Sequence, residues 1–312
     1  MQEKIAIKVN HLSKNFDEQK AVDDVSFTVK QGEVFGLLGP NGAGKTTILR
    51  MITTLLKPTS GTITIFGHDI KKESALARST FGLTGQYASV DEDISARENL
   101  MIFSRLNGLS KKSSQTRTNE LLKEFSLEKS ANKSLSTFSG GMRRRLDLAI
   151  SLITRPALIF LDEPTTGLDP RTRNQMWDTI RKLVKQGSTI VLTTQYLDEA
   201  DSLANRVAVI DHGKLIRIGT PAELKNETGE STMTLKISNQ DDINQASQIL
   251  KIELKSQPKI IDNTIVTKFK KTEQVTNGLS QLKNAKINIS DLTVQEPSLD
   301  DVFMALTVGK IN

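Results

Sequence analysis

The segment from Gly39 to Thr47, Gly-Pro-Asn-Gly-Ala-Gly-Lys-Thr-Thr, constrains the fold of this chain more than any other. It fits the pattern G-x-x-x-x-G-K-[ST] and lies between a short apolar run at 34–38 and a helical pattern at 47–52. Glycines in such a loop allow successive backbone N–H groups to point into one concavity, where they donate to phosphate oxygens. The positive end of the following helix dipole also attracts anions. The segment therefore predicts a buried strand, a phosphate-binding loop and a helix in direct succession.

Two side chains of this loop are expected to act on the phosphates. Lys45 would bring a mobile positive charge to the β- and γ-phosphates, and the Thr46 hydroxyl is placed to ligate Mg²⁺. The nucleotide is expected to be ATP, held by Gly39, Pro40, Asn41, Gly42, Ala43, Gly44, Lys45, Thr46 and Thr47.

A second glycine turn, Ser139-Gly140-Gly141-Met142, opens a helical run that continues to Ile153. Ser139 is a natural N-cap, and capping alone would explain it. The same geometry exposes unpaired N–H groups that could receive a γ-phosphate. Because one nucleotide needs only one such cradle, two half-sites indicate a dimer with ATP between the copies. The arginines at 143–145, on the same helix, are interpreted as a solvated face.

Two acids, Asp162 and Glu163, end the apolar strand at 158–161. A strand of a parallel sheet is buried on both faces, so carboxylates at its carboxyl end lie at the edge where ligands bind. Asp162 is expected to hold Mg²⁺ through water, and Glu163 to accept a proton from the water that attacks the γ-phosphate. A solvated strand end is the alternative interpretation of these acids.

The hydrophobic periodicity divides the chain into segments. Alternating strands at 5–9, 25–29 and 61–67 are expected to form a small antiparallel layer around the strand before the loop. Residues 95–153 are helical in pattern, and Ser95-Ala96-Arg97-Glu98 forms a capping box at their start. Past that block strands alternate with helices, which predicts a mostly parallel sheet.

The pattern of polar and apolar residues changes in the last third of the chain. A turn at Asp211–Lys214 is predicted to join two apolar strands as a hairpin. Residues 229–312 follow the order βαββαβ, which suggests a small ferredoxin-like sandwich closed by a helix at 298–307. We therefore expect a large domain at 1–228, containing a helical subdomain at about 88–153, and a C-terminal accessory domain.

Composition restricts the setting in which the chain works. The absence of cysteine excludes disulfides and thiolate metal sites and fits a reducing cytoplasm. The net charge of +6 is small and spread along the chain, so it does not argue for nucleic acid. Its apolar runs are too short to span a bilayer and its start does not resemble a signal peptide, so any membrane role is expected to come through a partner.

The motifs occur in the order found in ATP-binding cassette ATPases, which the chain resembles over about residues 1–225. The resemblance rests on the Lys45 loop, Gln86, Ser139-Gly140-Gly141, Leu161-Asp162-Glu163-Pro164 and Gly167-Leu168-Asp169. It implies an α/β fold: a P-loop NTPase cassette with a parallel core sheet, an antiparallel β subdomain and a helical subdomain, plus a small α+β C-terminal domain. It also implies a head-to-tail dimer, in which Lys45, Thr46, Asp162 and Glu163 of one copy face Ser139 and Gly141 of the other across ATP.

The resemblance implies roles for four further residues. Phe16 looks like the aromatic that stacks on adenine, although a core phenylalanine at a strand end is the alternative. Gln86 matches a residue that touches Mg²⁺ and the attacking water beside the transmembrane partner, and Asp169 matches a loop that links the two sites. Where the family usually has a γ-phosphate-contacting histidine, this chain has Gln195. Glutamine can donate a hydrogen bond but cannot take a proton, so we expect Gln195 to sense the γ-phosphate and Glu163 alone to act as base.

Gln195, together with the segments 84–92 and 296–303, is similar to the daunorubicin/doxorubicin-resistance branch of the family. That branch implies an ATPase, peripheral at the cytoplasmic face of the cell membrane, that energises export of a drug, antibiotic or lipid-like substrate. Its cofactors would be ATP and Mg²⁺. Its partners would be an integral-membrane permease in a separate chain and a second copy of itself or a homologous cassette, with no nucleic acid.

Two other functions are a soluble cassette ATPase and an import subunit. A soluble cassette acting on ribosomes or DNA is disfavoured by the single P-loop and the absence of sustained heptads. Import stays open because the cassette does not set the direction of transport. The acids at 91–93 are hypothesised to line a groove that receives a permease helix, and a solvated helix entrance is the alternative.

Overall fold

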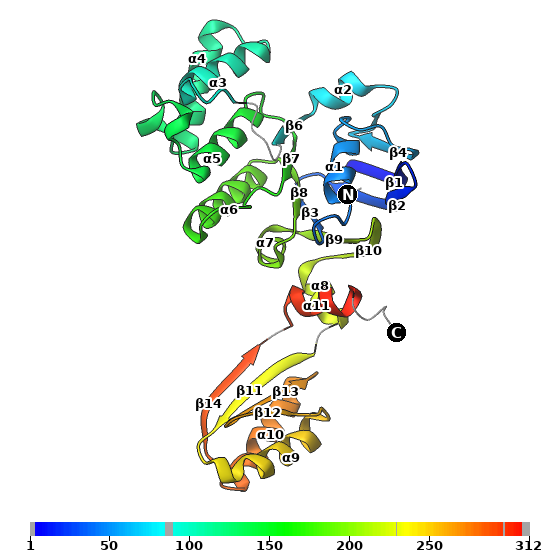
Figure 1. Ribbon diagram of the computed structural model, residues 1–312, viewed down its shortest axis with the longest axis vertical. Coiled ribbons are helices and arrows are strands. Elements are labelled where there is room, and N and C mark those ends of the chain that lie inside the picture. Colours follow the sequence, from blue (N-terminus) through cyan, green and yellow to red (C-terminus); the bar gives the residue numbers. More distant parts are fainter. Residues whose placement is uncertain (1–3, 85–89, 229, 296, 308–312) are drawn as a thin grey trace. The chain divides into compact units, whose positions relative to one another are not determined.

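A computed structural model describes residues 4–84, 90–228, 230–295 and 297–307 of the 312-residue chain (Figure 1). The chain divides into two compact units, Met1–Pro221 and Ala222–Asn312. This division falls one short helix earlier than the boundary expected at 228/229. Helix α8 (Pro221–Thr228) belongs to the second unit from Ala222 onward, whereas the composition turns polar only near its end.

The first unit is built on a six-stranded sheet with the strand order β10-β9-β3-β8-β7-β6. All neighbours are parallel except β9 and β10, which form the predicted hairpin. Every residue of β3, β7 and β8 is buried, as a sheet covered on both faces requires. The mostly parallel sheet is therefore confirmed. Its strands are β3 (Val34–Leu38), β6 (Phe81–Thr84), β7 (Leu158–Asp162), β8 (Thr189–Thr194), β9 (Arg206–Asp211) and β10 (Lys214–Gly219).

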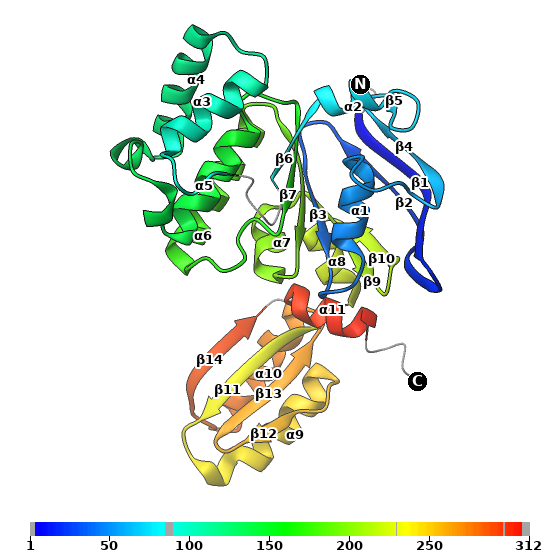
Figure 2. The ribbon, with the colours of Figure 1, turned by 45° about the horizontal axis from the view of Figure 1, so that its top comes forward.

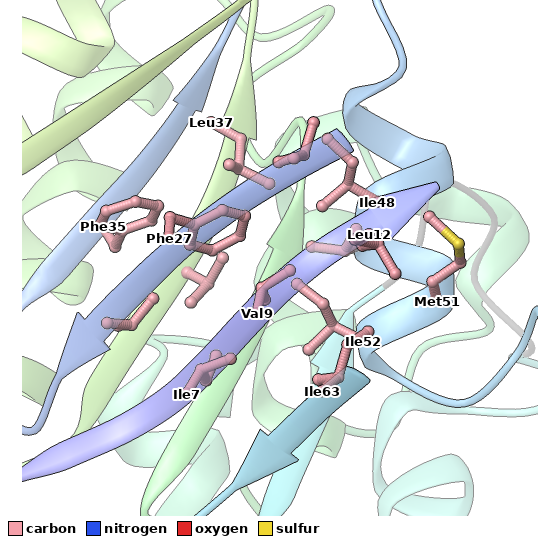
Figure 3. Packing of buried hydrophobic residues seen from close by; sticks show 14 of the residues in the cluster. Ile7, Val9, Leu12, Phe27, Phe35, Leu37, Ile48, Met51, Ile52 and Ile63 are labelled. Atoms are coloured by element: carbon pink, nitrogen blue, oxygen red, sulfur yellow. The ribbon is translucent and has the colours of Figure 1, made fainter. Parts of the chain in front are cut away.

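A second, antiparallel sheet in this unit has the order β2-β1-β4-β5, which confirms the predicted layer. Its strands are β1 (Ile5–Phe16), β2 (Gln19–Lys30), β4 (Ser60–Ile65) and β5 (His68–Asp69). Side chains from β1, including Val9 and Leu12, pack with Ile48 and Met51 of helix α1 (Lys45–Ile52) in one buried cluster (Figure 3). This packing anchors the helix that follows the phosphate-binding loop.

The helical part of the first unit lies beside the six-stranded sheet in both ribbon views (Figure 2). Ser95 and Glu98 form the predicted capping box, with Glu98 N donating to Ser95 Oγ at 3.2 Å and Ser95 N donating to Glu98 Oε2 at 2.8 Å. Among the described residues, no helix is both long and apolar enough to cross a membrane. The helices of this unit are α2 (Ser74–Ser79), α3 (Ala96–Leu106), α4 (Lys111–Glu124), α5 (Gly140–Ser151), α6 (Pro170–Lys185) and α7 (Leu197–Leu203).

The second unit contains the predicted βαββαβ succession. Its sheet has the order β12-β13-β11-β14 with every neighbouring pair antiparallel, which is a ferredoxin-like arrangement. Side chains of α9 and α10 pack on β11 and β13 in a separate core. The elements after α8 are β11 (Ser231–Ile237), α9 (Ile243–Leu254), β12 (Lys259–Ile261), β13 (Thr264–Phe269), α10 (Thr272–Asn284), β14 (Ile289–Gln295) and α11 (Leu299–Thr307).

Candidate active site

The phosphate-binding loop joins β3 to α1 as predicted, and close backbone neighbours explain two of its glycines. A Cβ on Gly39 would lie 2.1 Å from the carbonyl oxygen of Ile210 in β9. Gly44 has φ +103°, and a Cβ there would lie 2.7 Å from the Ala21 carbonyl oxygen. The hairpin after β9 also supports the loop, because Gly213 N donates to Ala43 O at 2.9 Å. The loop is therefore enclosed by backbone on two sides.

Lys45 is buried at the start of α1, with 4% of its surface exposed. Its ammonium donates to the carbonyl oxygens of Gly39 at 2.7 Å and Pro40 at 2.9 Å, and lies 3.9 Å from Glu163 Oε1. Burial lowers the pKa of Lys45, and the nearby carboxylates of Glu163 and Asp162 oppose that shift. An anion in the adjoining pocket would favour the charged ammonium.

That pocket has a volume of about 410 Å³ and adjoins the phosphate-binding loop. Its lining includes Asn41, Gly42, Thr46, Glu163 and the turn residue His212. The backbone donors of the loop and the carboxylate of Glu163 thus meet in one hollow. A phosphate chain fits this combination of donors, cation and acid.

Asp162 lies at the end of β7, and its Oδ1 accepts hydrogen bonds from Thr46 Oγ1 at 3.2 Å and Thr193 Oγ1 at 2.5 Å. The structure therefore brings together two of the three predicted Mg²⁺ ligands, Thr46 and Asp162. A hydroxyl and a carboxylate oxygen fit Mg²⁺, which usually takes one or two protein ligands and completes its shell with water and phosphate oxygens. No group of three His, Cys, Asp or Glu side chains suited to a metal occurs in the described part of the chain.

Glu163 follows Asp162 and has a left-handed backbone, with φ +48°. Its N–H donates to Thr193, at 3.2 Å from the carbonyl oxygen and 3.0 Å from Oγ1. Its Oε2 accepts a hydrogen bond from Thr166 Oγ1 at 3.2 Å. The carboxylate is 9% exposed and lines the phosphate pocket, so the alternative of a solvated strand end is wrong.

The second glycine turn begins α5, and Ser139 is its N-cap as predicted, with Met142 N donating to Ser139 Oγ at 3.3 Å. Gly141 packs closely on α6, because a Cβ there would lie 2.3 Å from Thr172 Cγ2. Asp169 caps α6 and accepts from Thr172 N at 3.0 Å and Thr172 Oγ1 at 2.6 Å. Thr172 thus lies between Gly141 and Asp169. The described residues that line the phosphate pocket do not include Ser139, Gly140 or Gly141.

The remaining predicted residues have different surroundings. Gln195 directly follows β8, and the carbonyl of the preceding Thr194 accepts from Gly39 N at 3.3 Å, which puts Gln195 near the phosphate-binding loop. Phe16 ends β1 and is 45% exposed, so the alternative of a core phenylalanine is wrong. Gln86 lies outside the described residues.

The interpretation of the arginines at 143–145 as a solvated face is wrong. Arg143 pairs with Glu92 at 2.5 Å, and Arg145 donates to the Phe125 carbonyl at 3.1 Å. Arg144 donates to the carbonyl oxygens of three consecutive residues, 162–164. These partners are distant in sequence, so the pattern of the helix alone could not identify them.

Sequence reasoning also missed two carboxylates near this site, one fully buried and one half-buried. Glu199 of α7 is fully buried, and its Oε1 accepts from Thr165 Oγ1 at 2.7 Å and from Trp177 Nε1 at 3.3 Å. Burial raises the pKa of Glu199. Asp147 of α5 is half-buried, and burial raises its pKa to about 6, opposed by Arg144 and Arg143. Neither acid belongs to a motif that would have marked it.

Comparison with known proteins gives two matching family models. "ABC transporter" matches residues 22–166, and "ATP-binding protein DrrA1-3-like, C-terminal domain" matches residues 219–307. The daunorubicin/doxorubicin resistance ATP-binding protein DrrA of Streptomyces peucetius is 44% identical, over 97% of this chain and 92% of its own length. The linearmycin resistance ATP-binding protein LnrL of Bacillus subtilis is 34% identical, over 96% of this chain and 98% of its own.

Solved structures match the first unit. cbiO1 from Clostridium perfringens, part of the ABC transporter complex cbiONQ, aligns with a TM-score of 0.66 and 28% identity, over 71% of this chain and 91% of its own. A dimeric ATP-binding cassette in a post-hydrolysis state, bound to ADP and Pi, aligns with a TM-score of 0.62 and 27% identity, over 69% of this chain and 98% of its own.

Proposed function

Since the chain belongs to the ABC transporter family, as an ATP-binding subunit with ATPase activity, we propose that it energises export of a drug, antibiotic or lipid-like substrate through a separate membrane permease. One observation supports the proposed chemistry: Lys45, Thr46 and Glu163 line a single pocket, and Asp162 accepts a hydrogen bond from Thr46. The direction of transport is supported by full-length similarity to relatives named for daunorubicin, doxorubicin and linearmycin resistance.

Binding of ATP follows from the loop. The backbone N–H groups and Lys45 hold the phosphates, and a negative γ-phosphate favours the ammonium that burial alone disfavours. Thr46 and Asp162 would hold Mg²⁺, Asp162 through water, and the ion when bound neutralises charge on the β- and γ-phosphates. Phe16, exposed at the end of β1, would stack on adenine. Gln86 is the residue expected to touch Mg²⁺ and the attacking water.

Glu163 acts as the general base. Its carboxylate lines the phosphate pocket, at 3.9 Å from the Lys45 ammonium, where it can accept a proton from a water aligned on the γ-phosphate. Gln195 donates a hydrogen bond to the γ-phosphate and senses its presence, without taking a proton. Base chemistry therefore rests on a single side chain.

Dimerisation completes the phosphate site. The α5 N-terminus of the partner copy, with Ser139 as its cap, supplies N–H donors to the γ-phosphate. The space beside Gly140 is open within its own chain, because a Cβ there would meet no described atom within 4 Å, and this leaves room for a partner copy to approach. By analogy, an arginine finger supplied in trans contributes about 10³ to 10⁵ in rate to phosphoryl transfer. Asp169, which caps α6 beside Gly141, links the two sites of the dimer.

The expected partners are the permease and a second copy or homologous cassette, at the cytoplasmic face of the membrane. The role proposed for residues 229–312 is to support the dimer or to regulate it. A soluble cassette that acts on ribosomes or DNA is the competing class, and co-purification separates the two. Recovery with a membrane protein supports the transporter, whereas recovery with ribosomes or nucleic acid contradicts it.

Glu163→Gln tests the proposed chemistry. We expect the variant to bind ATP but not to hydrolyse it, and therefore to accumulate as a dimer in Mg-ATP. Phosphate release and light scattering after size-exclusion chromatography measure the two effects. Glu128→Gln, which removes an exposed carboxylate on the same unit, is the control. A Glu163→Gln variant that stays monomeric in Mg-ATP, or that hydrolyses ATP at the parent rate, contradicts the proposal.

A further inference from the structure

Arg144 makes an unusual set of contacts from the first turns of α5. Its Nη2 donates to the carbonyl oxygens of Asp162 at 2.6 Å and Glu163 at 2.8 Å, and its Nε donates to that of Pro164 at 3.1 Å. These carbonyls lie where β7 ends and the chain leaves the sheet. The carbonyl of Glu163 also accepts from Thr166 N at 3.3 Å, and the Arg144 guanidinium supplies a side-chain donor to all three carbonyls.

Arg144 contacts the backbone of Glu163, whose conformation sets the direction of the carboxylate proposed as base. Glu163 has φ +48°, a region that residues other than glycine adopt only where surrounding contacts hold them. On one side its N–H is bonded to Thr193 of β8. On the other side its carbonyl is bonded to Arg144. Thr193 and Arg144 therefore hold the Glu163 backbone from opposite ends of the residue, one at its N–H and the other at its carbonyl.

The charge of Arg144 is compensated within the same region. Burial lowers the pKa of the guanidinium, while the carboxylates of Asp147, Asp162, Glu199 and Glu163 oppose that shift in this order. A planar guanidinium has several donors in fixed directions, which suits three carbonyls around it. A lysine ammonium at this position would be a single point charge on a flexible stem.

We propose that Arg144 is a positioning residue for ATP hydrolysis: it holds the Glu163 backbone so that the carboxylate stays directed into the phosphate pocket. The proposal rests on the proposed role of Glu163 as base. The proposal gives α5 two roles. Its N-terminus contributes to the ATP site of the partner copy. Its Arg144 holds Glu163 of its own chain, which acts on the ATP bound by that chain.

The test is Arg144→Gln, with Arg143→Gln as the matched control. Arg143 is one residue away but bonds to the exposed Glu92 instead of the β7 carbonyls. We expect Arg144→Gln to lower kcat by about 10- to 100-fold, the range for a misplaced catalytic group, with KM for ATP within about twofold of the parent. Arg144→Lys should recover little, because a single ammonium nitrogen cannot take both positions from which Nε and Nη2 reach these carbonyls. A kcat for Arg144→Gln within about twofold of that for Arg143→Gln overturns the proposal.

Three further measurements separate positioning from folding and from the base assignment. Thermal unfolding identifies a variant that fails to fold, and Arg144→Lys then decides: lowered kcat at unchanged KM supports the proposal and parent-like kcat overturns it.

Adding Arg144→Gln to Glu163→Gln should cause no further loss of residual hydrolysis, whereas an additive loss overturns the proposal. If Glu163→Gln stays active, the base assignment fails; if it is inactive while Arg144 variants are normal, only the positioning role fails.

Discussion

Neutralising Asp147 should stabilise the first unit, and the gain should depend on pH. Asp147 lies on α5, one turn after Arg144, and its Oδ1 has no hydrogen-bond partner among the described residues. Burial raises its pKa from 3.8 to about 6, and Arg144 and Arg143 oppose this shift. The ionised carboxylate is therefore less stable in the folded chain than in the unfolded chain. Asp147→Asn keeps the shape and removes the charge.

The sign and size of the change in unfolding free energy follow from the linkage between proton binding and folding. Between pH 3.8 and about 6 the folded chain binds more protons at Asp147 than the unfolded chain, so stability falls as pH rises through this window. The rise in pKa from 3.8 to about 6 corresponds to about 3 kcal/mol, lost in full above pH 6. The linkage expression puts the loss of stability at about half of this value at pH 5 and at nearly all of it at pH 8. The Asp147→Asn variant has no carboxylate at this position and should show neither loss.

Urea unfolding at pH 5, 6, 7 and 8 measures this difference. Trp177 is the only tryptophan of the chain and belongs to the first unit, so its fluorescence reports unfolding of that unit alone. Asp93→Asn, which neutralises an exposed carboxylate, is the control and should match the parent. Asp147→Asn should exceed the parent in free energy of unfolding at pH 8, and the gap should narrow toward pH 5. A gap that is absent, or that widens as pH falls, refutes the reasoning.

Two further substitutions test the helix packing and the γ-phosphate sensor. Gly141→Ala would place a Cβ 2.3 Å from Thr172 Cγ2, too close for two carbon atoms, so we expect ATP-driven dimerisation to be lost while ATP binding remains. Thr172→Ser in the same chain removes Cγ2 and should restore part of the dimerisation, which light scattering in Mg-ATP measures. Gln195→Ala should slow phosphate release while Gln195→His stays active, and an inactive histidine variant would contradict the sensing role.

Local signals in the sequence predicted the elements that local physics determines. The loop at 39–47, the capping box at Ser95 and the N-cap at Ser139 each depend on residues within a short stretch of chain, and all three occur as expected. The βαββαβ order of the second unit follows from apolar periodicity in the same way. Within the site, the pairing of Thr46 with Asp162 was predictable because both follow buried strands of one parallel sheet.

Features that depend on distant chain segments were not predictable. Strand β6 has only four residues and contains Gly82, which weakens any strand pattern. The glycine is needed because a Cβ there would lie 2.3 Å from the Ser151 carbonyl at the end of α5. Glu199 likewise depends on Thr165 and Trp177, which come from a loop and from another helix. Such requirements arise only when the elements pack.

The orientation of the arginines at 143–145 follows from helix geometry once the buried positions of α5 are known. Successive residues of an α-helix point roughly 100° apart, so three adjacent side chains cannot share one face. Positions four apart do share a face, and the residues four positions after Arg144 and Arg145 are the buried Leu148 and Ala149. Two of the three arginines therefore had to approach neighbouring elements. A half-buried guanidinium requires acceptors, and the carbonyls at the end of β7 are the acceptors that Arg144 reaches.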